Sequence, residues 1–248
     1  MEFVFLMKQH VGVPCEPVVK AMAAVERGQM IAVPPKGALG SPIYSSICGI
    51  VTSADKNKIV VEEQETDFDR YKPLTGTTPK ELIEESGLVG LGGAGFPTSV
   101  KLNVKFKKEG TVIVNAAECE PILAHNIARI EKEPEKLLRG LAIVMEVTGA
   151  KNGIIAIKGI YKEAVKELER VNQSNDVTIF PLENIYPMGE ERAIVRETLG
   201  ILLEPEQLPM AADAVVVNAE TVYRVREAVE ERKPLIDKDM TVAGKLMA

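Results

Sequence analysis

The chain has 248 residues, a hydrophobic share of 46%, a charged share of 27% and a formal net charge of -6. This composition is that of an ordinary globular protein, and the length allows one large domain or two smaller ones. No apolar run approaches the roughly 18 residues of a membrane span, and the N-terminus lacks the basic region of a secretory signal. We therefore expect a cytoplasmic protein without direct membrane insertion. Its interspersed charges argue against a nucleic-acid partner, which would need clustered Lys and Arg.

The cysteine and histidine content excludes the common metal sites. Cys15, Cys48 and Cys119 are odd in number, lie far apart and form no C-x-x-C pair. The sequence therefore predicts neither a disulfide framework nor a zinc or iron–sulfur site. His10 and His125 form no recognisable metal motif. No metal is expected, so any redox chemistry uses an organic cofactor.

The first part of the chain, residues 1–72, is predicted to be a small all-β domain. Short β-prone runs separated by Gly and Pro occur at residues 11–14, 17–20, 30–33, 43–46, 49–52 and 58–61. Such spacing indicates a sandwich or barrel, and the pattern resembles the biotinyl/lipoyl-like barrel-sandwich fold. A carrier lysine at a hairpin tip is missing, because Lys36 lies in a loop context. Residues 62–78, rich in acid, Thr and Pro, are typical of a linker.

The remainder of the chain, residues 73–248, is predicted to be a Rossmann-like α/β domain. Buried β runs are expected at residues 111–115, 153–157, 176–180 and 214–218. Helical patterns are expected at residues 127–148, 161–171, 190–199 and 219–231. Nearly continuous Val/Ile strands that alternate with helices indicate a mostly parallel sheet covered by helices.

Polar segments follow three of the predicted strands. They are residues 115–121, 184–191 and 218–221. In open parallel sheets, ligands bind beyond the carboxyl ends of the strands. Together with a glycine loop at residues 90–97, these segments predict one shared pocket.

The glycine loop matches a dinucleotide-binding pattern only literally. Gly90, Gly92 and Gly95 satisfy G-x-G-x-x-G, but that fingerprint needs a strand immediately before the first glycine. Here residues 78–87 predict a helix, with a Thr N-cap, Pro at the first position and a terminating Gly. The loop is therefore not predicted to be a Rossmann turn for NAD.

The loop keeps a physical capacity to bind a phosphate or a flat ring. Consecutive glycines let backbone N–H groups approach such a ligand without a Cβ in the way. Lys101, on the helix expected after Pro97, would neutralise a phosphate, and Phe96 would cover a ring face. The alternative is a glycine-rich turn that only packs a helix closely.

Four stretches of the sequence resemble one known family. Residues 90–98 with Lys101, residues 115–121 and residues 186–191 resemble the flavin site of the Rnf-complex C subunit. The same site occurs in the NADH-binding flavoprotein subunit of respiratory complex I. Residues 6–20 resemble the N-terminal barrel-sandwich segment of the Rnf-type members. Within the family, the sequence most resembles the Rnf C-like electron-transfer protein associated with proline reductase.

The resemblance implies a cofactor, a substrate and the residues that hold them. It implies non-covalent FMN bound by Gly90, Gly92, Gly93, Ala94, Gly95, Lys101, Asn115, Glu118, Cys119, Tyr186, Gly189, Glu190, Asn218 and Thr221. It assigns Phe96, Glu120 and Glu191 to NADH, with Glu191 in the catalytic position that orients the nicotinamide. As alternatives, an acid at a helix start merely complements the helix dipole, and Tyr186 packs at a strand end.

The resemblance also implies an electron-transfer module. NADH would transfer a hydride to FMN, and electrons would pass to a redox partner: an Rnf-type complex subunit, a ferredoxin or a reductase. The module would work peripherally to a membrane complex. Full-length members continue into β-grasp and iron–sulfur domains, so iron–sulfur clusters are expected only in regions or partners outside this chain.

Two departures and two alternatives qualify this expectation. The complex I loop has Arg where this chain has Leu91, and an Asp where this chain has Ala117, so we expect fewer polar contacts to the flavin. One alternative is a non-catalytic adaptor that keeps the fold. The other is a flavin-dependent cobalamin reductase, which shares these motifs.

Overall fold

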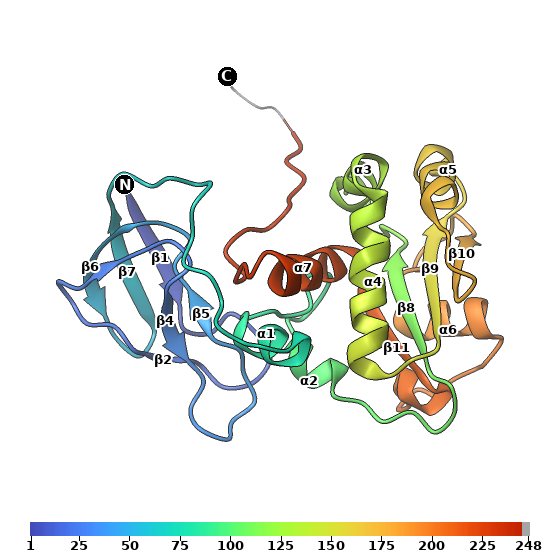
Figure 1. Cartoon of the computed structure of the whole chain (residues 1–248), viewed down its shortest axis with the longest axis horizontal. Helices are drawn as coiled ribbons and strands as arrows, with labels where there is room; N and C mark the ends of the chain where they lie inside the picture. Colours follow the sequence, from blue (N-terminus) through green and yellow to red (C-terminus); the bar gives the residue numbers. More distant parts are fainter. Residues whose placement is uncertain (245–248) are drawn as a thin grey trace. The chain divides into compact units, whose positions relative to one another are not determined.

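The computed structural model describes residues 1–244 and contains two compact units (Figure 1). Of the described residues, unit 1 comprises 1–101 and 227–238, and unit 2 comprises 102–226 and 239–244. The domain division expected between residues 72 and 73 follows a change of composition and stays a prediction. The compact units divide after Lys101, so the glycine loop belongs to the same unit as the N-terminal strands.

Unit 1 is built on two antiparallel sheets, which confirms the barrel-sandwich prediction. Their strand orders are β1-β7-β6-β3 and β2-β4-β5. The strands are β1 (Glu2–Leu6), β2 (Glu16–Pro17), β3 (Ala24–Val25), β4 (Met30–Val33), β5 (Ile43–Tyr44), β6 (Gly49–Ala54) and β7 (Lys58–Glu63). Apolar side chains from both sheets form one core, which includes Ile31, Ile47, Val51 and Ile59.

Several strand predictions differ from the structure. Residues 17–20 contribute only Pro17 to a strand, and β3 was not among the predicted runs. Residues 11–14 form no strand. Gly12 has a φ of 117°, and the Val13 N–H donates at 3.1 Å to the carbonyl oxygen of Leu39, which lies outside the strands. Conversely, β1 was not expected. It pairs antiparallel with β7 from Glu2 opposite Glu62 to Leu6 opposite Lys58. For residues 11–14 and for β1, contacts with residues distant in the sequence therefore decided whether a strand forms.

The helix before the glycine loop has the predicted caps. Helix α1 (Pro79–Glu85) has Thr78 as N-cap, and Glu81 completes a capping box by accepting from the Thr78 N–H. Pro79 occupies the first helical position, where its missing N–H costs nothing. Gly87, just past the helix, has a φ of 77°. The short helix α2 (Thr98–Leu102) follows the loop.

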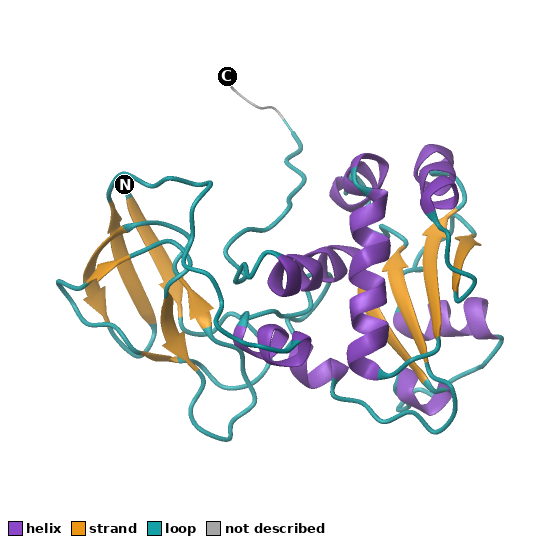
Figure 2. Cartoon of the chain, viewed as in Figure 1, coloured by secondary structure: helices purple, strands orange, loops and turns teal. Residues whose placement is uncertain are grey.

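Unit 2 contains the predicted parallel sheet, with the strand order β10-β9-β8-β11 (Figure 2). All three strand pairings are parallel. The strands are β8 (Thr111–Ala116), β9 (Asn152–Lys158), β10 (Val177–Leu182) and β11 (Ala214–Asn218). The Rossmann-like α/β prediction is thereby confirmed.

The helices of unit 2 agree with the sequence pattern except at one position. They are α3 (His125–Lys132), α4 (Pro134–Thr148), α5 (Lys162–Val171), α6 (Glu191–Leu199) and α7 (Ala219–Glu230), with the 3-10 helix η1 (Pro209–Ala212). Helix α7 begins in unit 2, and its residues from Glu227 onward belong to unit 1. One continuous helix was expected over residues 127–148. Pro134 divides it, because proline starts a new helix more easily than it continues one.

Helices cover both faces of this sheet. Helix α4 contacts β8 and β9, and α6 contacts β9 and η1. Ile113 of β8 and Val216 of β11, which are register partners, share one core cluster with Ile194 and Val195 of α6. Burial on both faces explains the continuous apolar runs. No helix within residues 1–244 is long and apolar enough to cross a membrane.

Candidate functional site

The glycine loop of unit 1 is closed at its base and open at its tip. Val89 and Pro97 form an isolated antiparallel bridge, and the Gly90 N–H donates to the Phe96 carbonyl oxygen at 2.8 Å. Phe96 is 37% exposed. Lys101 lies in the last turn of α2, as expected. The base of the loop is thus fixed by backbone hydrogen bonds, whereas its tip consists of residues 91–95.

Backbone space at the tip fits a closely bound ligand. A Cβ added at Gly93 would meet no atom within 4 Å. The backbone N–H groups of Gly92, Gly93 and Ala94 donate to no protein acceptor in the part of the chain that the structure describes. Next to the loop, the buried Thr98 Oγ1 also has no hydrogen-bond partner within residues 1–244. Unused donors and an unpaired buried hydroxyl are what a bound polar group would satisfy.

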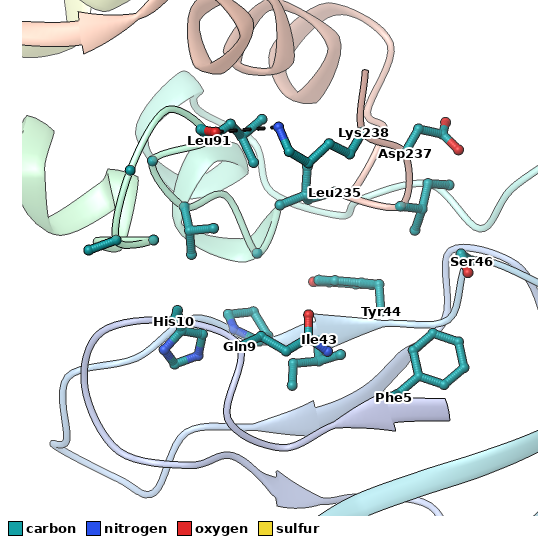
Figure 3. A pocket seen from close by; sticks show the side chains of 18 residues that line it. Phe5, Gln9, His10, Ile43, Tyr44, Ser46, Leu91, Leu235, Asp237 and Lys238 are labelled. Atoms are coloured by element: carbon teal, nitrogen blue, oxygen red, sulfur yellow. Dashed lines mark hydrogen bonds between the residues drawn. The ribbon is translucent and has the colours of Figure 1, made fainter. Parts of the chain in front are cut away.

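A cavity of about 510 Å³ lies beside this loop, wholly within unit 1 (Figure 3). The lining comes from the glycine loop, from strands β1 and β5 with residues next to them, and from the segment after α7. It includes Gln9, His10, Tyr44 and Lys238. Gly95, with a φ of 70°, approaches His10 so closely that an added Cβ would lie 3.2 Å from the His10 Cα. The volume is within the range of about 300 to 1,000 Å³ found for small-molecule sites.

In unit 2, the structure brings the two predicted asparagines together. Asn115 and Asn218 are register partners at the carboxyl ends of β8 and β11. The Asn218 Oδ1 accepts the Thr221 N–H at 3.3 Å, at the start of α7. The Thr221 side chain is buried. These residues therefore lie at the sheet edge where parallel sheets bind ligands.

A second set of contacts joins β8 to the segment after β10. The Asn115 Nδ2 donates to the Gly189 carbonyl oxygen at 2.9 Å, and the Gly189 N–H donates to the Cys119 Sγ at 2.6 Å. An added Cβ at Gly189 would lie 2.7 Å from that sulfur, so only glycine fits. Segments 74 residues apart are thus held together by a glycine, an amide and a thiol.

Glu118 has a structural partner that the sequence did not indicate. Its carboxylate accepts the Asn126 backbone N–H at 3.0 Å and the Asn126 Nδ2 at 3.2 Å, at the start of α3. Its φ is 44°, in the left-handed region. The Asn126 Oδ1 is buried without a hydrogen-bond partner within residues 1–244. The Glu118 carboxylate therefore anchors a helix, and the adjacent amide oxygen is left unpaired.

The acidic residues of the third motif lie at the start of α6. Glu190 is the N-cap and accepts the Ala193 N–H at 3.0 Å. Burial alone would raise the pKa of Glu190, but hydrogen bonds from Arg192 and Ala193 hold it below its usual value. Glu191 is the first helical residue, and Tyr186 is 72% exposed. The two acids thus complement the helix dipole, whether or not either contacts a ligand.

Two residues near this site were missed by the sequence reasoning. Lys158 ends β9 and is 6% exposed, and its Nζ donates to the Glu118 carbonyl oxygen at 3.5 Å. Burial and the neighbouring acidic groups raise the pKa of Tyr161. A polar residue that ends an apolar strand had identified Asn115 and Asn218, and the same signal was present at Lys158.

The predicted site residues therefore fall into two groups. The loop residues, Phe96 and Lys101 belong to unit 1, and the strand-end residues belong to unit 2. Open glycines, unused backbone donors and unpaired buried oxygens fit a flat, phosphate-bearing cofactor. With a barrel-sandwich domain and a parallel-sheet α/β domain, these features define a class of nucleotide-binding α/β proteins.

The family follows from comparison with known domains. Residues 83–227 match the Nuo51 FMN-binding domain, and residues 1–68 match the RnfC barrel sandwich hybrid domain. The chain therefore belongs to the Nuo51 FMN-binding domain family, with an Rnf C-like N-terminal domain. The resemblance noted from the sequence is confirmed at the level of the family.

Curated relatives include components of ion-translocating complexes. The C subunit of the Na(+)-translocating ferredoxin:NAD(+) oxidoreductase complex of Acetobacterium woodii is 28% identical, over 96% of this chain and 58% of that protein. The cobalamin reductase PduS of Citrobacter freundii is 36% identical, over 67% of this chain and 36% of that protein. The chain thus spans less than two thirds of the length of these relatives.

Solved structures show the same fold. The NAD+-reducing [NiFe]-hydrogenase in its H2-reduced state is similar with a TM-score of 0.53 and 24% identity. The match covers 61% of this chain and 31% of that chain. The air-oxidized state gives a TM-score of 0.52 at 27% identity, over 60% of this chain and 30% of the other.

Proposed function

We propose that this chain is the FMN-binding module of an NADH-linked electron-transfer protein. The match of residues 83–227 to the Nuo51 FMN-binding domain carries the proposal. The hydrogen bonds among Asn115, Cys119 and Gly189 support it, because they join two of the predicted motifs at a ligand-binding sheet edge. FMN, when bound, would supply the conversion between hydride transfer from NADH and release of single electrons.

In this proposal the glycine loop supplies mainly backbone donors. The N–H groups of Gly92, Gly93 and Ala94 bind FMN, and Gly90 and Gly95 let the backbone approach it. Lys101 contributes a positive charge. Phe96, with 37% of its surface exposed, stacks on the dinucleotide. Backbone donors in fixed positions bind without the loss of side-chain freedom.

The strand-end residues would orient the flavin and the nicotinamide. Asn115, Asn218 and Thr221 hold polar groups of FMN at the ends of β8 and β11. Further contacts to FMN are proposed for Glu118, Cys119, Tyr186, Gly189 and Glu190. Glu120 and Glu191 contact NADH, with Glu191 orienting the nicotinamide. No side chain is required to act as an acid or base, because hydride transfer needs positioning.

The proposal extends to partners and location. The electrons would pass to a redox partner protein: an Rnf-type complex subunit, a ferredoxin or a reductase, in a cytoplasmic assembly peripheral to a membrane complex. The relatives that belong to ion-translocating complexes support such an assembly. More specifically, we propose that the chain transfers electrons in association with proline reductase. Iron–sulfur clusters would be supplied by regions or partners outside this chain.

An absorption titration tests the proposal directly. Purified chain incubated with FMN should retain yellow colour after gel filtration and show a shifted flavin spectrum. NADH added under anaerobic conditions should then bleach the visible absorption band of the bound flavin. A folded chain that takes up no flavin at tens of micromolar FMN would refute FMN binding and favour the non-catalytic adaptor. Flavin uptake without bleaching would refute NADH oxidation alone.

Cobalamin reduction is a second candidate function. The observation that favours it is the 36% identity to a cobalamin reductase over 67% of this chain. The flavin-loaded chain with NADH should then reduce a corrinoid under anaerobic conditions, followed by its absorption spectrum. A flavin that NADH reduces but that transfers nothing to the corrinoid would exclude this function.

A further inference from the structure

The segment that follows α7 brings a cation to the glycine loop within unit 1. Lys238 lines the cavity of about 510 Å³, and its Nζ donates a hydrogen bond to the Leu91 carbonyl oxygen at 3.3 Å. Figure 3 shows this bond on the side of the cavity opposite His10 and Tyr44. The bond spans 147 positions of sequence, so the fold alone places the ammonium there.

The carboxylate beside Lys238 in the sequence is bound by two other cations. Asp237 is the single carboxylate among the described lining residues, and its Oδ1 accepts from the Arg27 Nη2 at 2.7 Å. Its Oδ2 lies 2.5 Å from the Lys233 Nζ. Burial alone would raise the pKa of Asp237, but hydrogen bonds from Lys233 and Arg27 hold it below its usual value. The carboxylate also points away from the Lys238 ammonium (Figure 3).

Backbone N–H groups of the glycine loop add partial positive charge beside the Lys238 ammonium. The N–H groups of Gly92, Gly93 and Ala94 donate to no acceptor within residues 1–244, and Gly93 borders open space. Gly93 and Ala94 line the same cavity as Lys238. An ammonium beside consecutive unused N–H groups is the arrangement that binds phosphate oxygens.

We propose that Lys238 binds a phosphate group of the nucleotide held at the glycine loop. The inference rests on the proposed function and deepens it, since it adds a phosphate-binding residue from outside every motif. The ammonium donates to the carbonyl oxygen of Leu91, and the side chain of Leu91 is uncharged. The phosphate belongs either to FMN or to the pyrophosphate of NADH, because the same chemistry recognises both.

The experiment uses variants of the full chain in which the positive charge at residue 238 is removed, kept or moved to the loop. Lys238→Met removes the charge at similar length, and Lys238→Arg keeps it. Lys238→Met with Leu91→Lys returns a cation to the loop. Lys36→Met is the matched control, because Lys36 is an exposed loop lysine of the same unit outside the cavity. Each variant is titrated with FMN and with riboflavin, which lacks the phosphate, and is assayed for the KM of NADH and for melting temperature.

A phosphate contact to FMN predicts that Lys238→Met weakens FMN binding about tenfold, since a charge-assisted hydrogen bond is lost, and leaves riboflavin binding unchanged. A contact to the NADH pyrophosphate predicts unchanged flavin binding and a KM for NADH raised about tenfold at constant kcat. Either result supports the proposal, with recovery in Lys238→Arg or the relocated variant.

Other results would overturn it. Unchanged FMN, riboflavin and NADH parameters in Lys238→Met would show that the ammonium contacts no ligand phosphate. Equal weakening of FMN and riboflavin would show that Lys238 only supports the Leu91 carbonyl. A wild-type chain that binds neither flavin would refute the proposed function and this inference together. If the wild type binds FMN, but no more tightly than Lys238→Met and with the same KM for NADH, this inference alone is refuted.

Discussion

The two groups of candidate site residues, one in each unit, use their hydrogen bonds in opposite ways. The tip of the glycine loop in unit 1 offers open space and backbone N–H groups that donate to no protein acceptor within residues 1–244. In unit 2, Asn115, Cys119 and Gly189 are bonded to one another, and Asn218 is bonded to the start of α7. The loop tip therefore has unused backbone donors, whereas the strand-end residues use their hydrogen bonds to hold neighbouring segments of unit 2 in place.

This difference predicts different mutational outcomes in the two units. Substitutions at the strand ends should lower stability and ligand binding together, because each side chain holds a neighbour. Substitutions at the loop tip should affect ligand binding and leave stability unchanged. Four substitutions, at Gly189, Asp239, Gly93 and Thr78, test this contrast.

The largest effect is expected from Gly189→Ala. The new Cβ would lie 2.7 Å from the Cys119 Sγ, which the packed motif cannot accommodate without a shift. We expect a loss of about 2 to 3 kcal/mol in the free energy of unfolding, the upper part of the range for overpacking, and loss of FMN binding. Urea unfolding and flavin titration measure both.

Cys119→Ala combined with Gly189→Ala is the matched control. Removal of the sulfur makes room for the new methyl group, so the double variant should be more stable than Gly189→Ala. Wild-type stability in Gly189→Ala itself would show that the contact between these residues does not constrain the site.

Asp239→Asn should have the next largest effect on unit 2. The carboxylate accepts from Arg129 at 2.7 Å and from Arg224 at 2.8 Å, and Arg224 is only 6% exposed. We expect a loss of about 1 to 2 kcal/mol at neutral pH, below the range of fully buried pairs because the Asp239 side chain is 32% exposed.

The effect of Asp239→Asn should depend on pH. Burial alone would raise the pKa of Asp239, but Arg224 and Arg129 hold it below its usual value. A lowered pKa contributes stability above the unfolded pKa of about 3.9, and this stability is lost as the pH falls through the folded value. The gap to wild type should therefore narrow below pH about 4. Asp176→Asn, at an exposed loop, is the control, and a gap independent of pH would contradict the prediction.

Gly93→Ala tests the loop half of the contrast. The new methyl group meets no protein atom within 4 Å, so the melting temperature should not change. A ligand on the loop would meet it, and we expect FMN binding to weaken about tenfold, or about 1.4 kcal/mol. Gly37→Ala is the crossed control: that residue also borders open space but has a φ of 78°. It should lower stability by about 1 kcal/mol and leave FMN binding unchanged.

Thr78→Ala should have the smallest effect. The Thr78 side chain accepts the Glu81 N–H at 3.2 Å in the capping box of α1. Its loss should cost about 1 kcal/mol of stability, and Thr78→Ser should restore it. FMN binding should be equal in all three proteins. Weaker binding in Thr78→Ala at unchanged stability would mean that α1 controls the loop and that the contrast between loop and strand ends is too simple.

Much of the fold could be predicted because its signals are local. The cap residues Thr78 and Pro79 predicted α1, and the four Val/Ile runs predicted the parallel sheet. Local signals failed where a distant partner decided the structure. Strand β1 exists because it pairs with β7, whereas in residues 11–14 the Val13 N–H donates to Leu39, which lies outside the strands.

For the candidate site, the sequence by itself determined which residues carry polar groups at strand ends and that the glycine loop follows a helix. Periodicity and helix caps are encoded by neighbouring residues, so they can be read without a fold. Only the tertiary structure decided that Glu118 anchors α3, that Gly189 fits against Cys119, and that Lys238 reaches Leu91. The physical reason is that hydrogen bonds act over about 3 Å in space, and the sequence does not state which distant atoms the fold brings within that distance.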